Sequence, residues 1–139
     1  MKNFETLLKI QDTIQRDHQG MDSQSMTMAE RADEMMRQQQ YLLDEITELM
    51  TALGGPFGKA SWKKWKADHK TVKGLYVEDL DSDEWKEVVF ESADVLIFVL
   101  NILALAGVTG EEVLQAVEDK QNENIERWKC GDRIPLTRA

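Results

Sequence analysis

The feature that most constrains the fold of this 139-residue chain is an uninterrupted helical pattern in its first half. From Met28 to Leu53, a set of mostly apolar residues recurs at alternating spacings of four and three, which places these side chains along one side of an α-helix. Thr27 with Glu30 is typical of a helix start, and Gly54-Gly55-Pro56 of a helix end. The pattern predicts one long helix that packs along most of its length. Its inward stripe is expected to be Met28, Ala32, Met35, Gln39, Leu42, Ile46, Leu49 and Leu53.

Three further segments have helical periodicity. They run over about 3–17, from Asp81 or Ser82 to about Ala106, and from a Thr109 cap to about Lys129. Residues 19–26 read as a loop, and 57–81 as irregular chain with a short helix around 61–67. Residues 95–105 are apolar almost all round, so we expect them at the centre of the fold. The sequence predicts one all-α domain over 1–139, a four-to-five-helix bundle with tails at 1–2 and 130–139.

The composition argues against several classes of protein. The chain has 26 acidic and 17 basic residues, a net charge of -9, so no basic face for nucleic acid is expected. The longest apolar run, Val95 to Ala106, contains Asn101 and is shorter than the ~20 residues of a bilayer span. No apolar signal core precedes the first helix, and Cys130 is the single cysteine. We therefore expect a cytoplasmic protein that binds neither nucleic acid nor membrane.

Acidic pairs three residues apart are frequent in this chain, and most are expected to be solvated surface, including Glu84/Glu87. Two pairs differ in their surroundings. Glu45 and Glu48 lie at the edge of the apolar stripe, and Glu91 and Asp94 precede the most apolar stretch. Burying such carboxylates without partners is unfavourable by several kcal/mol, so a compensating group is expected.

A divalent cation is one candidate for that group. Oxygen donors without Cys or His suit Mg²⁺, with Mn²⁺ as the alternative, and Mg²⁺ completes its shell with waters and phosphate oxygens. The competing interpretation is that these acids form helix caps or ion pairs with Lys and Arg. Spacing and environment alone leave both interpretations open.

The two pairs resemble the motifs of the all-α nucleoside-triphosphate pyrophosphatase superfamily, which includes MazG-type enzymes and dimeric dUTPases. Its E-x-x-E followed by E-x-x-D matches Glu45–Glu48 and Glu91–Asp94. The resemblance covers about residues 4–129. It implies two or three Mg²⁺ ions bound by these four residues, with Glu45 and Glu48 also catalytic and Glu48 a candidate to accept the proton of the attacking water.

A third motif of the superfamily is a Lys followed four residues later by Asn or Arg, which Lys120 and Asn124 match. Arg127 lies on nearly the same helix face. The resemblance implies that this stripe contacts phosphate oxygens, with Lys120 catalytic. Without the resemblance, a surface lysine paired with a nearby acid is the simpler interpretation.

The dimeric dUTPase branch adds candidates for binding the base. Leu8-Lys9-Ile10-Gln11-Asp12 is similar to its first-helix segment, so Gln11 is expected to read uracil. That branch has Asn four residues later, where this chain has Gln15. Trp62 or Trp65 resembles its aromatic residue and can either stack on a base or pack in a core or dimer interface.

Asn101 lies seven residues after Asp94, so both share one helix face. It either contacts the base or sugar or joins two helices, because an amide inside an apolar helix needs partners. The sequence thus predicts a Mg²⁺-dependent deoxynucleoside triphosphate pyrophosphohydrolase, a homodimer or homotetramer, that acts on dUTP. The alternatives are the same chemistry on dCTP, dGTP or a modified nucleotide, and a non-catalytic helical dimerisation module.

Overall fold

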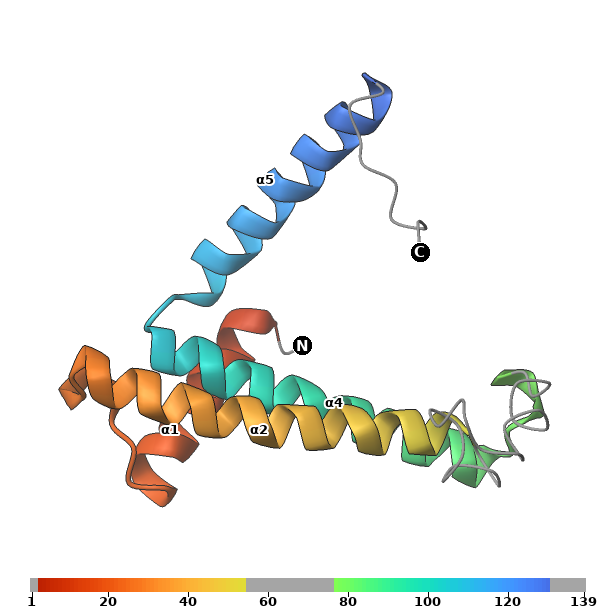
Figure 1. Ribbon diagram of the computed structural model, residues 1–139, viewed down its shortest axis with the longest axis horizontal. Coiled ribbons are helices and arrows are strands. Elements are labelled where there is room, and N and C mark those ends of the chain that lie inside the picture. Colours follow the sequence, from red (N-terminus) through yellow and green to blue (C-terminus); the bar gives the residue numbers. More distant parts are fainter. Residues whose placement is uncertain (1–2, 55–76, 131–139) are drawn as a thin grey trace.

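The computed structural model describes residues 3–54 and 77–130 of the chain (Figure 1). Within these ranges the structure is all-α without strands, as the sequence predicted. The predicted short helix around 61–67 lies outside the described residues, as does Trp62. The elements are α1 (Phe4–His18), the 3₁₀ turn η1 (Ser23–Ser25), α2 (Met28–Leu53), the 3₁₀ turn η3 (Val77–Asp79), α4 (Ser82–Ala106) and α5 (Gly110–Lys129).

The helix ends follow local chemistry, which is why they were predictable. Thr27 and Thr109 each accept a hydrogen bond from the backbone three residues on, at 3.1 Å in both cases. Asp81 and Glu84 form a reciprocal capping box at the start of α4. Gly107 ends α4 with a φ of +83°, a conformation that favours glycine.

Helices α2 and α4 run antiparallel side by side and share the most extensive interface of the fold, while α1 packs on α4 (Figure 1). The apolar core lies at the α1–α4 contact and is small. It consists of Leu8, Leu100 and Ala104, with Phe4, Leu7 and Leu103 partly buried around it.

The predicted central position of residues 95–105 is only partly realised. Leu100 and Leu105 are buried, but Leu96 and Ile97 are 42% and 39% exposed on the other side of α4. By length and composition alone, α4 is apolar enough to cross a membrane, although it also carries Glu91 and Asp94. A single chain therefore leaves a large apolar surface uncovered along α4.

The predicted inward face of α2 was only partly right: Met35, Leu42 and Leu49 are half-buried, but the other predicted residues are exposed. Gln39 is exposed and Met28 is 81% exposed, whereas Glu34 and Gln38 are buried. The prediction assumed that the buried face would be the most apolar one. Instead, polar groups on α4 provide partners for buried polar groups on α2, so that the actual seam is partly polar.

Helix α5 leaves the other helices at an angle, and only its start lies close to them (Figure 1). At this junction the Glu5 carboxylate accepts a hydrogen bond of 3.0 Å from the backbone N–H of Glu111. Gly110 allows the approach, since a Cβ there would lie 2.7 Å from the Cα of Glu5. The rest of α5 exposes Leu114, Val117 and Ile125.

Candidate metal centre

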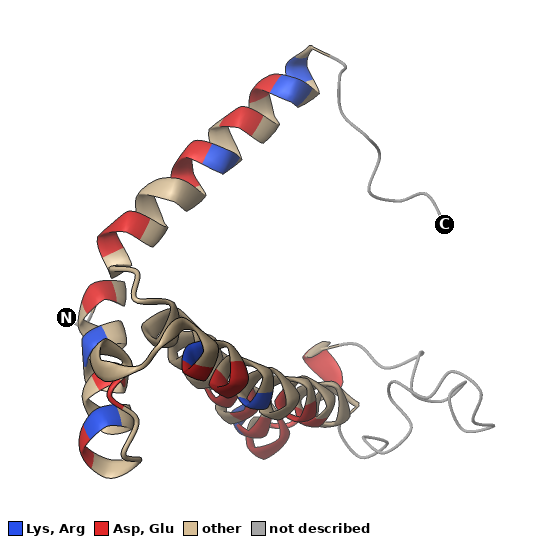
Figure 2. Ribbon diagram, turned by 60° about the vertical axis from the view of Figure 1, so that its left-hand side comes forward, with Lys and Arg blue, Asp and Glu red and all other residues tan. Residues whose placement is uncertain are grey.

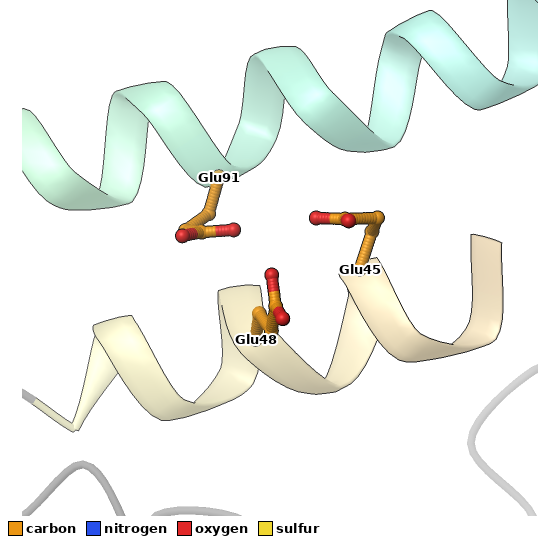
Figure 3. A group of neighbouring side chains, drawn as sticks. All are labelled: Glu45, Glu48 and Glu91. Atoms are coloured by element: carbon orange, nitrogen blue, oxygen red, sulfur yellow. The ribbon is translucent and has the colours of Figure 1, made fainter. Parts of the chain in front are cut away.

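The antiparallel pairing of α2 and α4 brings together three of the four predicted metal ligands (Figure 3). Glu45 and Glu48 come from α2 and Glu91 from α4, and one carboxylate oxygen of each lies within 4.8 Å of the others. Figure 3 shows the three side chains directed into the space between the helices. The group holds no histidine or cysteine, which is the donor chemistry that Mg²⁺ and Mn²⁺ prefer.

Asp94, the fourth predicted ligand, lies on α4 next to this group but is not one of the three that meet within that distance. Burial is the main cause of the raised pKa of Glu45 and of Glu91, and the negative charge of Asp94 adds to both. The structure therefore places all four acids in one electrostatic neighbourhood.

Three clustered carboxylates repel one another when all are ionised. Burial, a hydrogen bond with Glu87 and the proximity of Glu48 raise the pKa of Glu91 to about 7. Burial and the neighbouring Glu48 also raise the pKa of Glu45. The Oε2 atoms of Glu45 and Glu91 are both buried without a hydrogen-bond partner. A bound cation would neutralise the repulsion and supply the missing partner for these oxygens.

A pocket of about 250 Å³ opens beside the acidic group. It adds a residue that the sequence analysis assigned to solvated surface, namely Glu87. The available signal was its position one turn before Glu91, on the same face of α4. The pocket is lined by Thr47, Glu48, Thr51, Ala52, Glu87 and Glu91.

Asn101 joins two helices, one of the two roles expected for it. Its Nδ2 donates to Oε1 of Gln38 at 3.0 Å, and Gln38 in turn donates to Glu34 at 3.1 Å. Gln15 of α1 donates to the backbone oxygen of Asn101 at 3.4 Å. The side-chain oxygens of Gln15 and Asn101 remain buried without partners. This amide network therefore retains two unused acceptors.

Gln11, the residue expected to read the base, is buried on α1 at 8% exposure. Leu8, one turn earlier, packs against Leu100 and Ala104. Gln11 therefore belongs to the α1–α4 contact, near the amide network and further along α4 than the acidic group.

The structure does not bring the predicted phosphate-binding residues to the acidic group within one chain. Lys120, Asn124 and Arg127 are exposed on the part of α5 that projects away from α2 and α4 (Figure 2). Arg127 instead forms an ion pair of 3.0 Å with Glu123 on the same helix. In the single chain this stripe therefore lies on the surface, and the pairing with a nearby acid that the simpler interpretation expected for Lys120 is seen for Arg127.

Comparison with known proteins gives matches to nucleotide pyrophosphohydrolases. The family model of phosphoribosyl-ATP pyrophosphohydrolase matches residues 7–121, a range that includes the four acids and Lys120. This chain is 31% identical to the dCTP pyrophosphatases of Enterobacteria phages T4 and LZ5 over 102 residues, which is 70% of its length. The match spans 60% and 59% of the length of these two relatives.

A third relative is a DNA replication protein of Enterobacteria phage T4, 31% identical over 86 residues. That match covers 58% of this chain and 22% of the relative. No solved structure matches the chain. The extent of the family match and the two acidic motifs together show that this chain belongs to the phosphoribosyl-ATP pyrophosphohydrolase family, within the MazG-like all-α nucleoside-triphosphate pyrophosphohydrolase superfamily.

Proposed function

We propose that the protein hydrolyses a deoxynucleoside triphosphate to its monophosphate and pyrophosphate at the acidic group between α2 and α4. The observation that carries this proposal is the convergence of Glu45, Glu48 and Glu91 from two helices, with two of their oxygens buried and unpartnered. Family membership supports the reaction type. Magnesium, with manganese as the alternative, suits the all-oxygen donors.

The chain's own residues have separable roles in this reaction. A bound divalent cation supplies Lewis-acid activation of water and charge neutralisation. Glu48 is the most exposed of the three acids and lines the neighbouring pocket, so it is placed to accept the proton of the attacking water. Glu45 and Glu91 are half-buried, and their limited freedom favours fixed orientation of the bound group.

We propose dCTP as the substrate, in place of the dUTP that the resemblance of the first helix to dimeric dUTPases predicted. The relatives named dCTP pyrophosphatase support this choice. The side-chain oxygens of Gln15 and Asn101, which have no partner, can each accept a hydrogen bond from a ligand. Cytosine offers an amino group as donor where uracil has a carbonyl oxygen, so these oxygens favour cytosine. Asn101 lies two helical turns, about 10 Å, from Asp94 on the same helix face. A nucleotide lying along this seam would place its base at the amides and its phosphates at the acids.

A second copy of the chain would complete this site. Leu114, Val117 and Ile125 form an exposed apolar stripe on α5, and α4 exposes Leu96 and Ile97. Burying such surfaces against each other is favourable by about 25 cal/mol per Å² of apolar surface. Helix α5 of one protomer, laid along α2 and α4 of its partner, would bring a cationic stripe to an acidic site. The assembly is therefore proposed as a homodimer, or a homotetramer built from such pairs.

The test is a substrate panel with Mg²⁺, scored for monophosphate and pyrophosphate. It contains dCTP, dUTP, dTTP, dGTP, dATP and phosphoribosyl-ATP. We expect pyrophosphate release, with the highest kcat/KM for dCTP. Stepwise release of orthophosphate would overturn the reaction type, and the absence of any turnover would favour the helical dimerisation module.

Variants of the amides test the base assignment separately. Gln15→Met removes the unused acceptor, so we expect kcat/KM for dCTP to fall more than that for dUTP. Gln11→Met is the matched control on the same helix. An equal loss on both nucleotides in Gln15→Met would mean that Gln15 only supports the fold.

A further inference from the structure

Helix α2 has a second, largely apolar face besides the one that packs against α4. Among the described residues, α4 is the only helix that packs along α2 (Figure 1). The side of α2 that meets α4 carries Gln38, which accepts a hydrogen bond of 3.0 Å from Asn101. About a third of a turn away, residues recur at spacings of three and four along one line. This outer stripe consists of Met36, Gln39, Leu43, Ile46, Met50 and Leu53.

The outer stripe is exposed in the single chain. Met36 and Leu43 are 62% and 57% exposed, and Ile46 and Leu53 are 37% and 44% exposed. Large apolar side chains that follow one another along a surface are unfavourable in water and are typical of an interaction site. The stripe extends over 36–53, about 26 Å of helix, so a helix of similar length would cover it.

The outer stripe carries no charge, although the chain has a net charge of -9. Its borders are also uncharged, with Gln40 and Thr47 on one side and Leu42 and Leu49 on the other. A second copy of this acidic chain can therefore approach here without bringing like charges together. Helical periodicity places the charged residues of this segment on other sides of α2, and they are Arg37, Asp44, Glu45 and Glu48.

The spacing of the outer stripe reads the same from both ends, so two copies of α2 can pair about a two-fold axis. In an antiparallel pair with the axis between residues 44 and 45, Leu43 meets Ile46 of the partner subunit. Met36 likewise meets Leu53 of the partner subunit at the ends. All layers except those that contain Gln39 then join two apolar side chains. Antiparallel pairing also opposes the two helix dipoles, which parallel pairing would align.

We infer that the outer stripe of α2 is an interface with a second copy of this chain, in which the two α2 helices pair antiparallel. The inference does not depend on the proposed reaction, because no residue of the stripe belongs to the acidic group. It also differs from the α5 contact proposed above, which uses exposed residues of α4 such as Leu96. The axis lies at the level of Glu45, so the contact supports the acid-bearing segment of α2 from another side.

The first experiment traps the interface with disulfides in the full chain. Cys130, which is free and exposed, is replaced by Ser in every variant. Met36→Cys and Leu53→Cys chains are refolded separately and as a mixture, and then oxidised. We expect a covalent dimer in the mixture and little in either variant alone. Two copies of position 36 would lie about 26 Å apart in the antiparallel pair, far beyond the reach of a disulfide.

Either of two results overturns the inference. A covalent dimer that forms equally well in each variant alone would mean parallel pairing or random collision. A mixture without a covalent dimer would mean that α2 does not meet a second α2, whether the stripe is covered by α5 of another copy or by a different protein.

The second experiment measures the mass of the assembly by light scattering. Leu43→Asp combined with Ile46→Asp places charge at the centre of the interface, so we expect the mass to fall by about half or more. Lys86→Glu is the matched control, because it makes the same change in net charge at an exposed residue of α4. Circular dichroism checks that the helices persist in both variants.

An unchanged mass in the double variant, or an equal loss in Lys86→Glu, would contradict the α2 interface. A monomeric wild type would overturn the interface and the α5 contact together. None of these results bears on the proposed reaction, which the substrate panel tests separately.

Discussion

Asn101 of α4 donates a hydrogen bond of 3.0 Å to the side chain of Gln38 on α2 within a buried part of the interface. The two residues lie seven positions from Asp94 and Glu45, respectively, so the amide pair and the acidic group occupy the same seam. Tyr41 and Phe98 lie between them, with ring centroids 5.8 Å apart. The seam between α2 and α4 thus has two polar regions separated by an aromatic pair.

Removing Gln38 should destabilise the fold. Gln38→Ala deprives Asn101 of its acceptor and removes one of the two donors to Glu34, which also pairs with Arg37. We expect a loss of about 1–3 kcal/mol in the free energy of unfolding, measured by urea denaturation. Gln39→Ala is the control because Gln39 is exposed on the same helix. Equal stability of the two variants would contradict a structural role for the amide pair.

The acidic group makes stability depend on pH in the metal-free protein. The pKa of Glu91 is raised to about 7 in the folded chain, so the folded state binds more protons than the unfolded state between about pH 4.5 and 7. Stability should therefore fall as pH rises through this window. We expect a melting temperature several degrees lower at pH 8 than at pH 5 in EDTA.

Two comparisons check this assignment. Glu91→Gln should flatten the pH dependence, because it removes the titrating group. Mg²⁺ should raise the melting temperature more at pH 8 than at pH 5, since it binds the ionised carboxylates. A wild-type profile that rises with pH across this window would contradict the prediction.

Substituting Gly110 should disturb the junction of α5. In Gly110→Ala, the new Cβ would lie 2.5 Å from the Glu5 carboxylate and 2.7 Å from its Cα, so one helix must move. We expect a loss of about 1–3 kcal/mol in the free energy of unfolding, measured by thermal and urea denaturation. Adding Glu5→Ala should not restore stability, because the contact with the backbone of residue 5 remains. Full recovery in the double variant would place the conflict at the side chain instead.

Mixing two inactive variants should show whether α5 acts on the partner's site. Glu48→Gln removes the acid and Lys120→Ala removes the cation. If α5 of one chain acts on the site of its partner, refolding an equal mixture of the two variants forms heterodimers in which one of the two sites is intact. We expect each variant alone to be inactive and the mixture to regain about a quarter of wild-type kcat by this symmetry argument. No regain in confirmed heterodimers would indicate that Lys120 acts within its own chain, and an active Lys120→Ala variant would show that Lys120 has no role in turnover.

Much of the secondary structure was predictable because helix ends depend on neighbouring residues. The Thr27, Asp81 and Thr109 caps and the glycine at position 107 mark the boundaries seen in the structure. Glu45, Glu48 and Glu91 were identifiable because carboxylates beside apolar residues are unfavourable without compensation. These inferences need only contacts within a few residues.

The sequence by itself determined the all-α class, the helix boundaries and the acidic pairs, because spacing along one helix fixes which residues share a face. Only the tertiary structure decided which face of α2 is buried, since that depends on the partners offered by α4, such as Asn101 for Gln38. It also revealed Glu87 as a neighbour of the acidic group, and it directed Lys120 away from that group by the angle at which α5 leaves the fold. Those features arise from contacts between residues far apart in the sequence, where no local periodicity carries the information.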